Sequence, residues 1–226
     1  MRERPILFSG DMVRSILDGR KTVTRRLVPS WQLPTETSQA DGDKFRWMSV
    51  AQRDPRWGFG VFGRTEAECM AQYNEDGPRC CPFGNEGDRL WVREAFAYGL
   101  CTESSLAYRA THKPSDLEEG WFEPIKWTPS IQMPRWASRI LLEVTAVRVE
   151  RLQDITEEQA QTEGADPIRL DGLTASDISA LDLEWADPET PYRNGFRQLR
   201  GSLDGDWDAN PWVWVIEFKR VEASHA

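Results

Sequence analysis

The sequence predicts a fold of the α+β class, a small and mostly antiparallel β-barrel with short helices and three long insertions. Short strand patterns are interspersed with short helix patterns along the chain, which is typical of small mixed barrels. No Gly-rich phosphate loop joins a strand to a helix, which argues against a Rossmann or P-loop fold. The 226 residues fit one domain, with a core at about 5–29, 84–110, 136–164 and 209–222 and insertions at about 30–83, 111–135 and 165–208.

The first core segment is predicted to form a helix, a turn and a strand. Apolar residues within 12–17 recur at helical spacing, and Gly19 is placed where a helix commonly ends. Segment 22–28 is rich in β-branched residues and is stopped by Pro29, which indicates a strand. The turn between these two elements therefore lies next to residues 20 and 21.

Further strands are predicted in the middle and at the end of the chain. Segment 87–94 combines a turn with an alternating strand, and 106–110 is its expected hairpin partner. Segment 139–152 is the clearest strand, and its apolar residues change parity near Ala146, which predicts a β-bulge. The bulky residues of 211–221 fall on alternate positions, so one face of that strand is expected to be core.

A short helix is predicted directly after the long strand. Thr156 and Gln159 match a capping box at its start, and Gly164 provides the stop. Segments 174–183 and 192–199 are two further helix candidates within an acidic region. These signals place Glu163 at the C-terminal end of the capped helix.

Basic residues concentrate in one stretch of an otherwise acidic chain. The net charge of −9 argues against a protein that coats nucleic acid through bulk electrostatics. Arg20, Lys21, Arg25 and Arg26 nevertheless lie together, which indicates a local basic patch for a modified nucleoside, RNA or DNA. A solvated strand end is the plainer interpretation of the same cluster.

Aromatic and charged residues complete the predicted binding set. Several of the eleven tryptophans lie beside Pro, Gly or Arg, where such rings either stack on bases or plug the core of a loop-rich protein. The predicted substrate- or nucleic-acid-binding residues are Arg20, Arg25, Arg26, Trp91, Arg93, Glu94 and Trp136.

The predicted chemistry depends on Lys21, Thr24 and Glu163. The chain has two histidines, which leaves little material for a histidine-based triad. A threonine hydroxyl needs a base to become a nucleophile, and a lysine serves as that base only if burial or neighbouring cations lower its pKa. In an ideal strand Lys21 and Thr24 face opposite sides, so their cooperation requires the chain to turn between them. A solvated Glu163 at a helix end is the plainer alternative for the third residue.

The expected location is the cytoplasm, with no membrane partner. No signal-like segment opens the chain, and no run approaches the roughly 18 apolar residues of a membrane span. The adjacent Cys80 and Cys81, with Cys69, Cys101 or His112, lack the usual zinc-ligand spacing, so no metal and no cofactor is expected. The sequence gives no indication of the oligomeric state.

Four segments together resemble the ASCH domain, a family with a PUA-like β-barrel. They occur in the family's order, and the first is the most specific: Leu17-Asp18-Gly19-Arg20-Lys21-Thr22-Val23-Thr24-Arg25. The others are residues 87–92, 144–163 and 215–219. The resemblance implies a PUA-like barrel across the predicted core.

Within that family, the chain is similar to small bacterial amidohydrolases that remove the acetyl group from N4-acetylcytidine. Their lysine, threonine and glutamate would fall on Lys21, Thr24 and Glu163. The resemblance implies that the threonine attacks the amide carbonyl, the lysine activates it, and the glutamate orients or protonates the leaving amine. Those enzymes are much shorter, and the three insertions are departures from their pattern.

Other members of the family keep the alternatives open. The segment 133–139 before the long strand resembles ASCH-like proteins of bacteriophage and prophage genomes, for which the resemblance implies no activity. Some ASCH-like proteins are thought to bind RNA and some cleave it. A non-catalytic nucleic-acid reader, a nuclease and an interaction protein therefore stand beside the amidohydrolase hypothesis.

Overall fold

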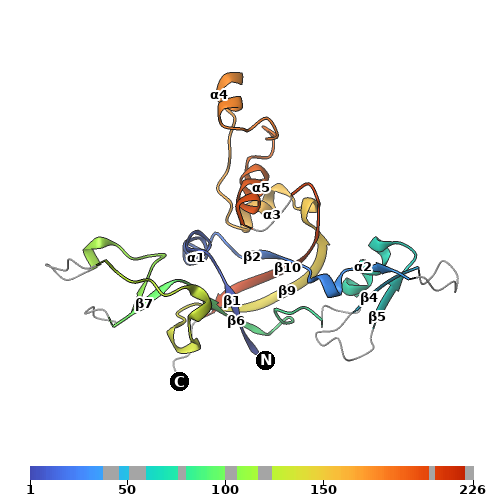
Figure 1. Ribbon diagram of the computed structural model, residues 1–226, viewed down its shortest axis with the longest axis horizontal. Helices are drawn as coiled ribbons and strands as arrows, with labels where there is room; N and C mark the ends of the chain where they lie inside the picture. The colour runs from blue at the N-terminus through green and yellow to red at the C-terminus, as the bar shows by residue number, and fades with distance from the viewer. Residues whose placement is uncertain are drawn as a thin grey trace. The chain divides into compact units, whose positions relative to one another are not determined.

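The computed structural model describes residues 1–37, 46–50, 60–75, 80–99, 106–116, 124–203 and 207–221 and has a mixed α+β fold (Figure 1). The predicted α+β class is confirmed. The strands are β1 (Glu3–Leu7), β2 (Val23–Leu27), β3 (Thr35–Glu36), β4 (Trp47–Val50), β5 (Gly60–Gly63), β6 (Arg89–Arg93), β7 (Phe96–Tyr98), β8 (Leu106–Tyr108), β9 (Leu141–Arg151) and β10 (Trp212–Val221). The α-helices are α1 (Gly10–Leu17), α2 (Glu66–Glu75), α3 (Glu157–Thr162), α4 (Ala175–Ala180) and α5 (Pro191–Leu203). Short 3₁₀ helices occupy Ser30–Gln32, Pro114–Asp116, Ser130–Gln132, Arg135–Ala137 and Leu152–Asp154.

The main sheet has five strands in the order β1-β6-β9-β10-β2. β1 pairs with β6 in parallel, whereas the β6–β9 and β10–β2 pairs are antiparallel. Among the described residues the order ends at β1 and at β2, and no pairing joins those two strands. The described sheet is therefore open at both edges.

The chain divides into two compact units, and the boundary between them runs through β9 and β10. The first unit comprises Met1–Gly19, Phe83–Ala146 and Phe218–Ala226, and the second comprises Arg20–Pro82 and Val147–Glu217. The single domain with three insertions stays a prediction.

The first unit contains α1, β1, β6 and a separate β7–β8 hairpin. Ser9 caps α1 by accepting a hydrogen bond from the backbone N–H of Met12, and Gly19 lies just beyond the helix with φ +74°, the left-handed region that glycine tolerates. The prediction that 106–110 pairs with strand 87–94 is wrong, because β8 pairs with β7. Both neighbours of β6 in the sheet are already taken, by β1 and β9.

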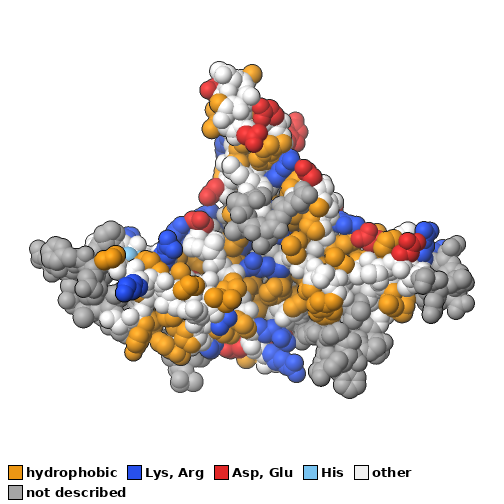
Figure 2. All heavy atoms as spheres, viewed as in Figure 1, with side chains coloured by type: hydrophobic (Ala, Val, Ile, Leu, Met, Phe, Trp, Pro, Cys, Tyr) orange, Lys and Arg blue, Asp and Glu red, His pale blue; other side chains and the backbone are white. Residues whose placement is uncertain are grey.

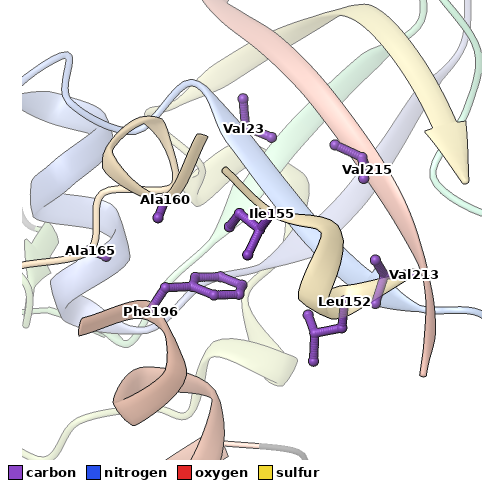
Figure 3. Packing of buried hydrophobic residues seen from close by; sticks show 8 residues of the cluster. All are labelled: Val23, Leu152, Ile155, Ala160, Ala165, Phe196, Val213 and Val215. Carbon is purple, nitrogen blue, oxygen red and sulfur yellow. The ribbon is translucent and has the colours of Figure 1, made fainter. Parts of the chain in front are cut away.

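The second unit has a hydrophobic cluster between strands β2 and β10 and helices α3 and α5 (Figure 3). The predicted capping box of Thr156 and Gln159 is present at the start of α3, and Gly164 follows its end with φ +79°. Packing of α3 in this cluster brings its C-terminal end towards the start of β2. The cluster consists of Val23, Leu152, Ile155, Ala160, Ala165, Phe196, Val213 and Val215.

The predicted insertion 30–83 contains regular structure of its own. β3, β4 and β5 form an antiparallel sheet, and α2 follows β5. Cys69, Cys80 and Cys81 are buried thiols, and burial raises the pKa of Cys69 to about 11. No group of three potential metal ligands occurs among the residues that the structure describes, and Cys101 lies outside them.

None of the helices in the described part of the chain is both long enough and apolar enough to span a bilayer.

Candidate functional site

The centre of the candidate site is an ion pair between Lys21 and Glu163. The Lys21 Nζ donates to Glu163 Oε2 at 2.6 Å, to the Glu163 carbonyl at 2.8 Å and to the Val23 carbonyl at 2.7 Å. The two side chains are only 1% and 5% exposed. All three N–H donors of the ammonium group therefore have acceptors in a site closed to solvent.

Local backbone structure explains how these two residues meet. Lys21 lies between the glycine that ends α1 and the first residue of β2, so the chain turns at this position. Glu163 is the C-cap residue of α3. The backbone N–H of Thr22 donates to the Thr162 carbonyl at 2.9 Å, which joins the two segments directly beside the ion pair.

Arg25 extends the pair into a buried network. Its Nη1 lies 3.3 Å from Glu163 Oε1, and its Nε and Nη2 donate to Glu150 Oε1 at 3.0 and 2.5 Å. Its Nη2 also donates to Gln159 Oε1 at 2.9 Å, and Arg148 Nε contacts the second oxygen of Glu150 at 3.0 Å. Lys21 and Arg25 thus both contact the Glu163 carboxylate. Arg25 is fixed in turn by Glu150 of β9 and Gln159 of α3.

Burial makes Lys21 chemically unusual. Loss of solvent around the ammonium group is the largest effect and lowers the pKa of Lys21, while the nearby Glu163 carboxylate opposes the shift. The positive charges of Arg26 and Arg25 lower the pKa of Lys21 further. Loss of the proton, which gives the form that can act as a base, is therefore easier for Lys21 than for an exposed lysine.

Thr24 is buried in β2, but the strand separates it from Arg25. Successive side chains of a strand point to opposite faces, and Val23 belongs to the hydrophobic cluster next to α3 and α5. Arg25 shares the face of Val23, whereas Thr24 is paired with Ile216 in β10 and points to the other face. Convergence of the Thr24 hydroxyl with the Lys21 amine stays a prediction.

A cavity of about 430 Å³ is lined by residues that flank Lys21 and Glu163 in the chain, although neither of these two side chains is part of its lining. Its lining includes residues immediately next to Lys21 and Glu163 in the chain, so an approaching ligand comes close to the backbone that carries them. Arg20 and Asp166 form an exposed ion pair at 3.5 Å in its wall. The cavity is lined by Arg20, Gln161, Thr162, Ala165, Asp166, Pro167 and Tyr192.

Four other predicted binding residues belong to the first unit. Arg93 lies over the Trp91 ring at 4.9 Å and donates to the Met133 carbonyl. Glu94 is buried and accepts two hydrogen bonds from the Arg139 guanidinium, at 2.9 and 3.0 Å. The remaining residue, Trp136, is 65% exposed and packs edge-to-face against the Tyr98 ring.

The basic cluster does not form one exposed surface. Lys21 and Arg25 are buried against carboxylates, Arg26 is half-buried, and Arg20 contacts Asp166. On the face shown in Figure 2, Lys and Arg side chains are scattered among other residues rather than gathered in one area.

Sequence reasoning missed Glu150, Gln159 as a ligand of Arg25, and Tyr192 in the cavity wall. Glu150 is half-buried in β9, and its place after the parity change, between Val149 and Arg151, does not distinguish it as a partner of Arg25. Gln159 was recognised only as a capping residue, although its amide oxygen accepts from both the Thr156 N–H and Arg25.

No protein-family model, curated protein or solved structure matches this chain.

Proposed function

We propose that this protein is an amidohydrolase that removes the acyl group from N4-acetylcytidine or a related acylated cytosine, on an ASCH-type, PUA-like barrel. One observation carries the proposal: a lysine with a lowered pKa is buried against a carboxylate, and residues that flank both in the chain line a cavity of about 430 Å³. Clefts of roughly 300–1,000 Å³ are typical of small-molecule sites.

Lys21 is assigned the role of general base. Its neutral amine accepts the proton of the Thr24 hydroxyl as that oxygen attacks the acyl carbonyl carbon. The carbon–nitrogen bond then breaks, and the proton passes to the departing cytosine amine. Water hydrolyses the resulting threonine ester, releasing the carboxylic acid and restoring the hydroxyl.

Glu163 is assigned the role of orienting the lysine and assisting proton transfer to the leaving amine. It accepts from the Lys21 Nζ at 2.6 Å and contacts Arg25 at 3.3 Å, so its position relative to the base is fixed from two sides. The mechanism also needs the Thr24 hydroxyl within hydrogen-bond reach of Nζ, which is its most demanding requirement.

The placement of the basic residues favours an enzyme over a phosphate-binding reader. A reader needs cations that reach phosphate oxygens from the surface. Lys21 and Arg25 instead direct their nitrogens at Glu163 and Glu150. Reaching a phosphate would leave these carboxylates buried without their partners, which is costly.

The test is incubation of the protein with N4-acetylcytidine, with conversion to cytidine followed by mass spectrometry. Lys21→Met and Thr24→Val should each lower turnover by about 10²-fold or more. Lys219→Met is the matched control, because Lys219 is 60% exposed on β10, and it should keep full activity. Full turnover in the Lys21 and Thr24 variants, or none in the native protein, would falsify the proposal. Salt-sensitive binding or shortening of RNA would indicate a reader or a nuclease instead.

A further inference from the structure

The cavity of about 430 Å³ has two walls of different origin. One wall consists of residues next to Lys21 and Glu163, and the other comes from the segment 165–208 that the sequence predicts to be an insertion. Tyr192, in the first turn of α5, is the aromatic residue that this second wall contributes. The segment therefore supplies part of the surface that a ligand would meet.

The position of Tyr192 is fixed by the backbone around it. The N–H groups of Tyr192 and Arg193 donate to the two carboxylate oxygens of Glu157 at 2.7 and 2.8 Å, which holds the start of α5 against α3. The Ile168 N–H donates to the Pro191 carbonyl at 2.9 Å. Hydrogen bonds thus hold the start of α5 both to α3 and to the loop at Ile168, as a preformed pocket requires.

Gly195 brings the facing loop close to α5. A Cβ at this position would lie 1.8 Å from the carbonyl oxygen of Asp166, a distance that no side chain tolerates. The absence of a side chain lets the backbone of Asp166 approach the helix one turn after Tyr192. Asp166 and Tyr192 consequently line the same cavity.

We propose that Tyr192 contacts the substrate by stacking on its planar ring, so that segment 165–208 contributes to substrate affinity. The proposal rests on the proposed function, since it places the ring of the acylated cytosine in this cavity. Stacking on an aromatic side chain is tolerant of ring substituents and gives affinity without proton transfer. Tyr192 therefore affects substrate binding, whereas the Lys21–Glu163 pair acts in the chemical step.

The experiment compares Tyr192→Ala with Tyr192→Phe, which keeps the ring. Tyr192→Ala should raise KM for N4-acetylcytidine by about tenfold with kcat within about threefold of the native value, and Tyr192→Phe should keep both. Calorimetric binding of cytidine, which cannot be deacylated, should weaken by a similar factor in the Ala variant alone. Tyr98→Ala is the control, because Tyr98 is 69% exposed and belongs to the first unit.

The outcomes separate this inference from the proposed function. Native turnover with an unchanged KM and unchanged cytidine binding in Tyr192→Ala overturns the role of Tyr192 and leaves the amidohydrolase in place. No turnover of any acylated cytosine, together with cytidine binding that Tyr192→Ala removes, overturns the amidohydrolase and keeps the stacking site. Absence of both turnover and cytidine binding overturns both. Thermal unfolding confirms that each variant is folded.

Discussion

Two buried ion pairs, one in each compact unit, use the same kind of carboxylate in different ways. In the second unit Glu163 is paired with Lys21, and neither side chain is more than 5% exposed. In the first unit Glu94 is paired with Arg139, whose side chain is 28% exposed and lies 4.0 Å over the Tyr108 ring. One cation is a compact ammonium enclosed by protein, and the other is a guanidinium that keeps contact with solvent.

The difference determines which pair can take part in proton transfer. An arginine stays charged at any pH that a protein tolerates, so the Arg139 pair can hold structure but cannot exchange a proton. A buried lysine shifts its pKa readily and can act as a base. Because the pKa of Lys21 is lowered, the pair in the second unit is the better candidate of the two for proton transfer.

The largest expected contrast is in stability when each carboxylate is removed. Glu163→Ala leaves Lys21 and Arg25 buried without their partner and should lower the free energy of unfolding by about 3–5 kcal/mol. Glu94→Ala should cost about 1–3 kcal/mol, because the half-buried Arg139 can turn towards water. Urea unfolding followed by far-UV circular dichroism measures both, and equal losses would contradict the contrast.

The next contrast concerns charge without proton transfer. Lys21→Arg keeps the positive charge but cannot supply a neutral base, so kcat for N4-acetylcytidine should fall by about 10²-fold or more, or about 2.7 kcal/mol of activation free energy. Arg139→Lys should leave kcat within about twofold. Steady-state kinetics of the folded variants test this, and an active Lys21→Arg protein would remove the lysine from the role of base.

A third contrast is the pH dependence of stability. Because the pKa of Lys21 in the folded protein lies below 10.5, the unfolded chain binds more protons between the two values. This contribution to stability grows as pH rises through that window and is lost as pH falls through the folded pKa. Within this pH window, the free energy of unfolding of the native protein should rise relative to that of Lys21→Met by up to about 1.4 kcal/mol per pH unit. Chemical denaturation across alkaline pH measures the difference, and Arg139→Met should not change the slope.

The smallest expected effect is that of Arg139→Lys on stability. The substitution replaces two guanidinium hydrogen bonds to Glu94 with a single-point ammonium contact, and partial exposure of the site limits the cost to about 1 kcal/mol or less. A loss above about 3 kcal/mol in urea unfolding would show that this pair is as enclosed as the one in the second unit.

Local signals predicted the elements that carry the site. Gly19 and Gly164 lie where helices end, with the positive φ angles that favour glycine, and Thr156 with Gln159 forms the expected capping box. The bulky alternate residues of β10 are buried as expected, but Val213 and Val215 on the other face are buried as well, in the cluster next to α3. These features depend on neighbours a few residues apart, which a sequence displays directly.

Long-range pairing was not visible. Arg25 looks like a binding residue in a basic cluster, but its carboxylate partners Glu150 and Glu163 are more than 100 residues away along the chain. The pairing of β8 with β7 was missed for a related reason, because the strand pattern does not show that both sides of β6 are occupied. The pairing of Lys21 with Glu163 was expected only through the ASCH resemblance, and the cavity wall at Tyr192 was not expected.

The most direct test of the central claim is an NMR titration of the lysine side-chain amines, with Lys21→Met used to assign the signal of residue 21. This signal should titrate below 10.5. A Lys21 amine that titrates at or above 10.5 would show that its burial does not yield a neutral base, and would contradict the proposed chemistry.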